Sequence, residues 1–205
     1  DPEDLLRGKI SETSFHPALS LKWDFFDDMA LRFAASRTTA RPSFKELAPV
    51  FTRDVDDNTR FHGNLFLETS RITNFDIRWE WFPNPGDVFA ISLFTKHIEN
   101  PIELFKTSQF TFFRNEESAE LYGFEIEGSK NLGFIDPIFE NFTISANFTK
   151  LVSSVVLGEE SRDARDTAGL DLNRPLQGQP DYIFNFNLSY DNEELGFFAG
   201  LFLNV

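Results

Sequence analysis

The sequence contains no cysteine among its 205 residues. Disulfide scaffolds, zinc sites built on thiolates and cysteine nucleophiles are therefore excluded. Histidine is scarce, and the three histidines, His16, His62 and His97, lie far apart along the chain. We interpret them as unrelated residues and predict no metal site. The sequence also lacks a phosphate-binding glycine loop and the common hydrolase and metalloprotease motifs, so we predict no catalytic residue, no cofactor and no enzymatic activity.

Basic residues are also in short supply. Lys and Arg together number 19 against 33 Asp and Glu, and the formal net charge is −14. A nucleic-acid partner needs a basic patch, so we exclude nucleic acid as a partner. A polybasic segment that lies on a membrane surface is excluded for the same reason. The acidic residues gather in stretches that we expect to be solvated loops, and these stretches lie near residues 54–57, 116–120 and 159–166.

Long apolar runs are missing. No segment approaches the roughly 18 apolar residues that a membrane helix needs. Asp1–Leu6 is acidic and has no apolar core of a signal peptide. The chain stops at Val205 inside an expected strand, so we expect residues 1–205 to be a piece of a longer protein. Barrel strands are about ten residues long and only half apolar, so a membrane β-barrel is still compatible with this sequence.

Phenylalanine, in contrast, is abundant, with 26 residues against 3 Tyr and 3 Trp. In Tyr182–Tyr190, large apolar or aromatic side chains occupy every second position, with small polar residues between most of them. Successive side chains of a strand point to opposite faces, so this segment predicts one apolar face and one polar face. Ile72–Phe82 repeats the pattern, with Asp76, Arg78 and Glu80 on its polar face.

This alternation predicts eight strands joined by connections that are short and long in turn. A membrane barrel produces such sorting, because its turns are short on one side of the membrane and its loops are long on the other, whereas a soluble sandwich has no reason to sort them. We therefore predict an all-β, transmembrane antiparallel up-and-down β-barrel. The expected strands are Phe15–Trp23, Met29–Thr38, Ile72–Phe82, Val88–Lys96, Glu120–Asn131, Asn141–Leu151, Tyr182–Tyr190 and one that starts at Leu195; the expected long loops are 39–68, 97–118 and 153–180.

Several segments carry more information than their periodicity. Leu31–Pro49, for example, contains the string S-x-T-x-A-R-P-S-F-x-E-L-x-P. The other segments are Gly63–Ser70, Glu80–Phe82, Asn100–Glu103, Asn115–Glu127 and Arg174–Tyr190. In this order, over residues 15–205, they resemble the barrels of TonB-dependent outer-membrane receptors, particularly those of the Bacteroidetes type. Gly63–Ser70 departs from the family's pattern because it lacks the usual prolines, so its loop conformation is expected to differ.

The resemblance implies a receptor of the bacterial outer membrane that imports a scarce nutrient, such as a siderophore, vitamin, glycan or peptide, with energy from TonB. It also implies a barrel of about 22 strands around a plug. Residues 1–205 would then be part of one barrel domain, with about eight strands of its C-terminal half. The plug, the TonB box and the remaining strands lie outside this chain. The implied partners are the TonB complex, outer-membrane lipids and lipopolysaccharide, and an unknown nutrient.

Two residues have expected structural roles. Arg41 precedes a proline, and we expect it to pair with Glu46 or with loop carbonyls; as part of the loop 39–68 it is also the candidate for a ligand contact. Gly123 is expected to admit a neighbouring backbone or aromatic ring against the barrel wall.

Two other functions are compatible with the residues alone. A closed barrel of eight strands is one, acting in the outer membrane as an adhesin or structural protein. A soluble β-barrel that binds a ligand is the other. The medium that contacts the Phe-bearing faces separates these hypotheses, because a soluble protein would bury those faces under a second layer of its own chain.

Overall fold

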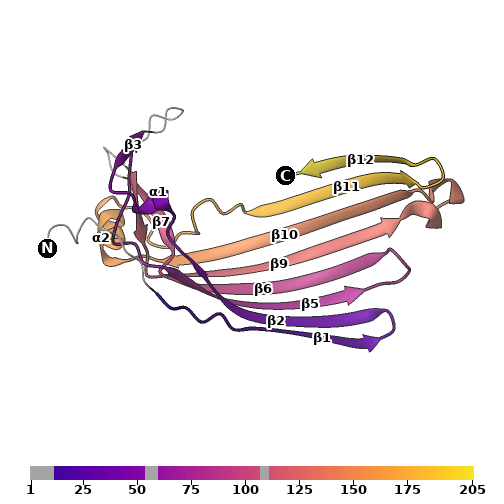
Figure 1. Ribbon diagram of the computed structural model, residues 1–205, viewed down its shortest axis with the longest axis horizontal. Helices are drawn as coiled ribbons and strands as arrows, with labels where there is room; N and C mark the ends of the chain where they lie inside the picture. The colour runs from indigo at the N-terminus through magenta and orange to yellow at the C-terminus, as the bar shows by residue number, and fades with distance from the viewer. Residues whose placement is uncertain (1–11, 54–59, 107–110) are drawn as a thin grey trace.

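The computed structural model describes residues 12–53, 60–106 and 111–205. Eight long strands form one antiparallel sheet that curves along its width (Figure 1). Each strand pairs with the preceding long strand, in the order β1-β2-β5-β6-β9-β10-β11-β12. The bounds are β1 (Ala18–Phe26), β2 (Met29–Ala40), β5 (Ser70–Trp81), β6 (Val88–Glu99), β9 (Ser118–Asn131), β10 (Phe142–Val156), β11 (Tyr182–Asn192) and β12 (Phe197–Asn204). The predicted all-β, up-and-down arrangement of eight strands is confirmed.

The connections are sorted by length, as expected. At one end of the sheet, which we call the turn end, the strands are joined by residues 27–28, 82–87, 132–141 and 193–196. The third of these turns contains two short 3-10 helices, η2 (Leu132–Phe134) and η3 (Pro137–Phe139). At the opposite end, the loop end, the long connections cover residues 41–69, 100–117 and 157–181. Positive φ angles of +85° at Gly86 and +60° at Gly196 allow two of the tight turns.

The loop end carries a second sheet that the sequence did not predict (Figure 1). The expected long loop 97–118 contains two of its strands, and the segment 111–115 is one of them. Its strands, in spatial order, are β3 (Phe51–Arg53), β4 (Arg60–His62), β8 (Thr111–Asn115) and β7 (Ile102–Lys106). Two helices, α1 (Phe44–Leu47) and α2 (Glu159–Thr167), lie in the same region. Neither helix in the described part of the chain is long and apolar enough to cross a membrane.

The strands continue further toward the loop end than the sequence predicted. β10 was expected to end at Leu151 but runs to Val156, where its last residue pairs with Ser118 of β9. β6 was expected to end at Lys96 but continues to Glu99, also opposite Ser118. These extra residues are mixed in polarity, so the alternation that marked the strands fades there. Pairing between neighbouring backbones, which side-chain periodicity does not report, sustains the strands.

The described residues contain very little packed interior. The buried hydrophobic residues are mostly small, and no large side chain is fully buried. The only cluster of buried apolar residues, among those described, is at the loop end, where Ala119, Val155 and Leu157 pack with Ile98 and Leu176. A sheet of this size without a core cannot be held together by apolar packing within the chain. The stability of the sheet must therefore depend on the surroundings that its two faces contact.

Candidate functional site

One face of the sheet, which we call the apolar face, carries the large hydrophobic side chains. Because directly paired residues of antiparallel strands share a face, the register shows the face continuing across the sheet. One such row contains Leu31, Trp79, Ile91, Ile126, Phe148 and Phe184. The side chains of Phe75 and Phe124 are 47% and 36% exposed, and neither Trp79 nor Phe184 is buried. No second layer of the described chain covers this face.

The apolar stretches shift steadily from strand to strand. The outward apolar stretch of β5 is Phe75–Trp81, and Trp81 is its residue nearest the turn end. The outward apolar stretch of β12 is Phe197–Leu203, and Leu203 is its residue nearest the loop end. Trp81 and Leu203 lie in the same row of the sheet. The intervening members of this row are Phe89, Gly128, Ala146 and Phe186. From β5 to β12 the apolar stretch moves by about 20 Å along the strand direction. Across the sheet, the five strand spacings between β5 and β12 add up to about 24 Å. If the apolar stretches form one level band, the strands tilt by about 40°, which is the tilt of membrane barrels.

Polar groups mark both borders of this band. Toward the loop end, the row of Phe75 and Tyr122 is followed by a row that contains Arg37, His97 and Glu120. His97 Nδ1 lies 2.5 Å from Glu120 Oε1. At the turn end, Trp81 Nε1 donates a hydrogen bond of 2.9 Å to Asp28 Oδ2, in the turn between β1 and β2. A ring with one apolar edge and one hydrogen-bonded edge is typical of a membrane–water interface.

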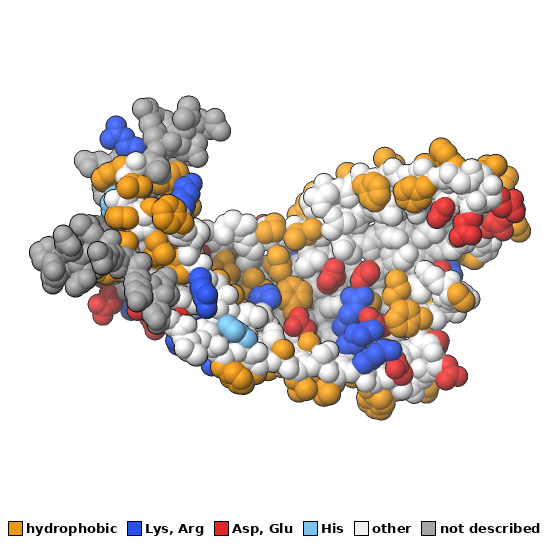
Figure 2. Space-filling view, in the orientation of Figure 1, with side chains coloured by type: hydrophobic (Ala, Val, Ile, Leu, Met, Phe, Trp, Pro, Cys, Tyr) orange, Lys and Arg blue, Asp and Glu red, His pale blue; other side chains and the backbone are white. Residues whose placement is uncertain are grey.

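The opposite face is polar and lines the hollow side of the sheet, where charged side chains gather (Figure 2). Arg32 Nε and Arg78 Nε donate hydrogen bonds of 2.7 and 2.9 Å to the two carboxylate oxygens of Glu80. Arg78 also binds Glu127 at 2.7 Å and Ser92 Oγ at 3.1 Å. Glu80 is only 7% exposed, and this pairing compensates for the burial of its charge. The expected polar face of β5, with Asp76, Arg78 and Glu80 on it, is therefore confirmed, and Glu127 of β9 lies on the same face.

Some aromatic residues lie on the polar face as well. The ring of Phe94 lies over Gly123, where a Cβ atom would come within 2.3 Å of the ring and 2.9 Å of the carbonyl oxygen of Lys150. The expected close approach of a ring and a backbone at Gly123 is confirmed. β12 carries Phe198 and Phe202 on the polar face, an arrangement that the other contacts of the structure do not explain.

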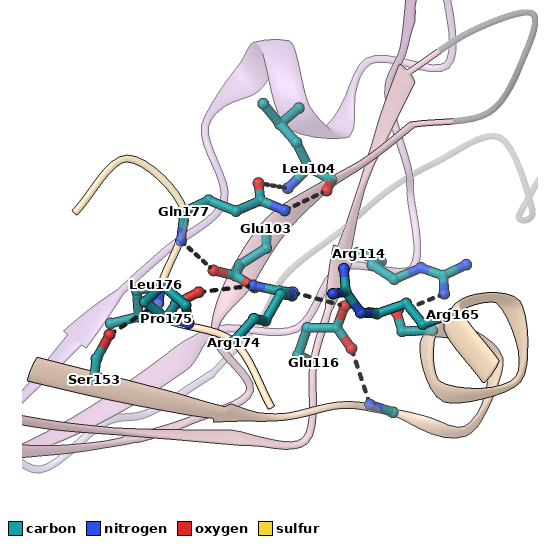
Figure 3. Close-up of polar contacts among 12 residues, drawn as sticks. Glu103, Leu104, Arg114, Glu116, Ser153, Arg165, Arg174, Pro175, Leu176 and Gln177 are labelled. Atoms are coloured by element: carbon teal, nitrogen blue, oxygen red, sulfur yellow. Dashed lines mark hydrogen bonds and ion pairs between the residues drawn. The ribbon is translucent and has the colours of Figure 1, made fainter. Parts of the chain in front are cut away.

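At the loop end, one arginine joins two of the long loops (Figure 3). Arg174 Nη2 lies 2.5 Å from Glu103 Oε2 and 3.5 Å from Glu116 Oε1. The arginine side chain is 14% exposed, and the carboxylates are 4% and 3% exposed. Buried charges of this kind are stable only when they are paired, so these three side chains fix the loops 100–117 and 157–181 against each other.

Glu116 also holds the beginning of helix α2. Its Oε2 accepts a hydrogen bond from the backbone N–H of Gly158 at 2.9 Å, and its Oε1 accepts one from Ser161 Oγ at 2.6 Å. Gly158 has no side chain to cap the helix, so a carboxylate from the neighbouring loop takes this role. Arg114 stacks over the ring of Phe105 at 3.8 Å and also donates a hydrogen bond to Ser161.

Gln177 extends the junction in the manner of a strand residue (Figure 3). Its side-chain amide accepts a hydrogen bond from the backbone N–H of Leu104 at 3.0 Å and donates one to the carbonyl of Leu104 at 2.8 Å. The backbone N–H of Gln177 donates to Glu103 Oε1 at 2.9 Å. The string R-P-L-Q of the third loop is thus bound to both the side chain and the backbone of the second loop.

Asparagine side chains connect the first loop to the second. Asn115 Nδ2 donates to the carbonyls of Glu68 and Asn100, at 3.0 and 2.8 Å, and Asn115 Oδ1 accepts from the N–H of Glu68 at 2.8 Å. Asn64 Nδ2 donates to the carbonyl of Phe113 at 3.1 Å. All three loops therefore belong to one hydrogen-bonded assembly, which we call the loop junction.

The first loop begins with a capped helix. Ser43 Oγ accepts from the N–H of Glu46, and the Glu46 carboxylate accepts from the N–H of Ser43 at 2.6 Å. Glu46 is thus engaged in a capping box, and among the contacts of the described residues it does not pair with Arg41. Arg41 is exposed, as a ligand contact would require. Gly63 lies against the backbone of Ala48, where a Cβ atom would clash at 2.0 Å.

A cavity of about 470 Å³ opens within the loop junction. Its wall combines Asn64 and Glu68 of the first loop, Arg114 and Glu116 of the second and Ser161 of the third. The described residues contain no group of three or more His, Cys, Asp or Glu side chains arranged to hold a metal ion.

The sequence predicted three long loops at one end of the barrel, but neither their contacts with one another nor the residues that join them. Glu103, Glu116, Arg174 and Gln177 lie in segments that resemble the family, yet only their partners in space reveal their roles. A signal was present: each is a polar or charged residue in a loop segment that resembles the family, and strand periodicity does not account for its position.

Comparison with known proteins agrees with this architecture. The family profile described as "TonB dependent receptor-like, beta-barrel" matches residues 2–205. Among solved structures, the siderophore receptor PirA from Pseudomonas aeruginosa is similar, with a TM-score of 0.56 and 16% identity over 85% of this chain and 27% of that chain. A ferric enterobactin receptor mutant from the same organism, in complex with enterobactin, gives a TM-score of 0.57 and 17% identity, over 85% of this chain and 25% of that chain.

The FrpB iron transporter from Neisseria meningitidis gives a TM-score of 0.53 and 12% identity, over 90% of this chain and 25% of that chain. A search of curated protein sequences gave no match. The chain spans about a quarter of the length of these solved receptors. With residues 2–205 matched, the chain belongs to the TonB-dependent receptor family, and its eight strands are part of a β-barrel of the bacterial outer membrane.

Proposed function

We propose that this chain is part of an outer-membrane receptor that binds a scarce nutrient outside the cell and imports it with energy from TonB. The observation that supports this function most directly is the loop junction, where three long loops of one barrel end are joined by buried ion pairs and hydrogen bonds beside a cavity of about 470 Å³. Specificity on a rigid scaffold normally comes from such loops. A purely structural barrel has no need to order them in this way.

The proposal includes parts that lie outside this chain: a plug, a TonB box and further strands of the same barrel domain. β1 and β12 are each paired on one side only, and in Figure 1 they stand apart. This arrangement disfavours a closed barrel made of these eight strands alone, acting as an adhesin or structural protein. The uncovered apolar face disfavours a soluble ligand binder. The segments resembling the Bacteroidetes type support an origin in that group.

The nutrient class is open among siderophores, vitamins, glycans and peptides. The ligand is expected to contact the loops 41–69, 100–117 and 157–181, and we propose Arg41 as one contact because its guanidinium is exposed on the first of them. Lipopolysaccharide and phospholipid are the proposed surroundings of the apolar face, and the TonB complex is the proposed partner on the periplasmic side.

The test begins with a panel of one ferric siderophore, cobalamin, an oligosaccharide and a peptide, each measured for binding to the full-length protein and for uptake by cells. We expect one class to bind, and its uptake to stop when TonB is deleted while binding persists. Arg41→Ala should weaken binding about tenfold, and Lys22→Ala, which removes a basic side chain of β1 outside the three loops, serves as its matched control. Uptake that continues without TonB, or a reading frame that encodes no plug, would refute the proposal.

A further inference from the structure

Hollows of about 420 to 450 Å³ interrupt the apolar face at several points, and one of them lies near the turn end. The row that begins at Trp81 and Phe89 continues with two small residues, Gly128 and Ala146, before it reaches Phe186. Between the large side chains, the two small ones leave a depression of about 440 Å³. Elsewhere in the band, most outward positions carry large side chains.

Nothing in the local backbone requires a glycine at position 128. The φ angle of Gly128 is not positive, and a Cβ atom there would come no closer than 3.9 Å to another residue, at Phe89 Cδ2. Gly123, on the same strand, is different, because the Phe94 ring fills the space above it. The missing side chain at position 128 therefore leaves space that the described chain does not fill.

Further strands of the barrel cannot cover this hollow. It lies over β6, β9 and β10, each of which is already paired along both of its edges. Additional strands would extend the sheet at β1 or β12, and a plug would lie on the polar face. The occupant must therefore approach from the membrane, as the neighbouring lipid-facing side chains require.

A cation lies at the rim of the hollow, on its turn-end side. Lys130 shares the outward side of its strand with Gly128, and its Nζ lies 2.5 Å from Asp87 Oδ2. The carboxylate of Asp87 is 4% exposed and accepts hydrogen bonds from Asn84 Nδ2 and from the backbone N–H of Asn131. Because the carboxylate is fixed in this way, it also fixes the position of the Lys130 ammonium group. Lys130 remains 36% exposed, and its Nζ also lies 5.1 Å from the centre of the Phe134 ring. Asp87 accepts one of the three N–H donors of the ammonium group, which leaves donors for a second acceptor.

We propose that this hollow is a binding site for one phospholipid of the periplasmic leaflet. An acyl chain lies over Gly128 and Ala146 beside the ring of Phe89, and the phosphate accepts hydrogen bonds from Lys130. The short turns of an outer-membrane barrel face the periplasm, so a headgroup at this depth belongs to the inner leaflet of the outer membrane. The site is independent of which nutrient the receptor imports.

The test is native mass spectrometry of the full-length protein released from detergent in the presence of phosphatidylethanolamine or of diacylglycerol with the same acyl chains. We expect the wild type to retain one phosphatidylethanolamine and to bind it about fivefold more tightly than diacylglycerol, because only the former carries a phosphate. Ala146→Leu fills the hollow and should abolish retention of both. Lys130→Gln should keep the binding of diacylglycerol and remove the preference for the phosphate-bearing lipid.

Ala199→Leu is the matched control, since it enlarges an outward alanine on β12 away from the hollow. It should bind both lipids like the wild type. Equal retention by the wild type and Ala146→Leu would overturn the proposal, as would an equal loss in the control. A protein dimer that is lost with Ala146→Leu would also overturn it, by identifying a second copy as the occupant.

Discussion

At the scale of single residues, the structure is governed by charges that are buried and paired. Glu80, Glu103 and Glu116 are each less than a tenth exposed, and each has a guanidinium partner. Burial of a carboxylate is costly, and the loss of its partner costs more than the pair contributes. These sites are therefore the places where a conservative substitution should have the largest effect.

Asp87, in the turn between β5 and β6, gives a pH-dependent prediction. Burial raises the pKa of Asp87, but hydrogen bonds from Lys130, Asn84 and the backbone N–H of Asn131 together lower it below its ordinary value. A lowered pKa in the folded state means that the stabilising contribution is present above the ordinary pKa of an aspartate and is lost as the pH falls below it.

The stability difference between the wild type and Asp87→Asn should therefore be constant, at about 2 kcal/mol, above pH 5 and should shrink as the pH falls below about 4. Urea unfolding in lipid bilayers over this range measures it. Asp27→Asn, at an exposed position in the turn between β1 and β2, is the control. A difference that stayed constant down to the lowest pH would show that Asp87 is not stabilised as a carboxylate.

At the scale of elements, the loop junction is the feature that a substitution tests best. Arg174→Met should leave the buried carboxylates of Glu103 and Glu116 without their cation and destabilise the junction by about 3–5 kcal/mol. The sheet should be much less affected, because its strands are held by backbone pairing. Hydrogen exchange should then rise at the backbone N–H groups of Leu104 and Gln177 and stay unchanged in β5 and β6.

Arg174→Met combined with Glu103→Gln is the matched rescue, since it removes one of the two unpaired charges. If exchange at Leu104 in the single variant equals that of the wild type, Arg174 does not hold the loops together.

The two faces of β10 give a second prediction at this scale. Phe148 points outward in the middle of the band, and Thr149 points to the polar face, directly opposite Glu125. Phe148→Arg should destabilise the barrel in bilayers by about 2–4 kcal/mol, because the charge would face hydrocarbon. Thr149→Arg should cost much less, because the lumen is hydrated and Glu125 is near. Comparable losses for both variants in urea unfolding would contradict the assignment of the faces.

The sequence predicted the sheet well and the loop end poorly, for physical reasons. Strands such as Tyr182–Asn192 are recognisable in the sequence because lipid on one face and water on the other impose a period of two on their side chains. The small sheet of β3, β4, β7 and β8 is held by aromatic pairs and backbone hydrogen bonds between short segments, and no such period marks it. The pairing of Arg174 with Glu103 joins residues of different loops, and a single sequence does not contain that information.

Arg41 illustrates the same limit within one loop. A pairing with Glu46 or with loop carbonyls was expected, but the carboxylate of Glu46 accepts from the backbone N–H of Ser43 instead. The string S-F-x-E contains this alternative, because Ser followed three residues later by Glu is the pattern of a capping box. Local helix geometry therefore decided the partner of Glu46.

At the scale of the whole molecule, a single claim connects the faces, the tilt and the family: the Phe-bearing side of the sheet contacts lipid and the other side contacts water. The described chain has almost no core of its own, so the membrane supplies the apolar environment that an interior would otherwise supply. The strand tilt of about 40° follows from the register once this band is taken as level.

The most direct measurement uses spin labels on single cysteines placed one at a time along residues 121–127 of β9, a strand that contains no native cysteine. In bilayers, collision rates with oxygen, which partitions into lipid, and with a water-soluble nickel complex should alternate with a period of two. We predict that labels at Tyr122, Phe124 and Ile126 are accessible to oxygen, and that labels at Glu125 and Glu127 are accessible to nickel. Nickel access at both Phe124 and Glu125, or an absence of alternation, would contradict the account.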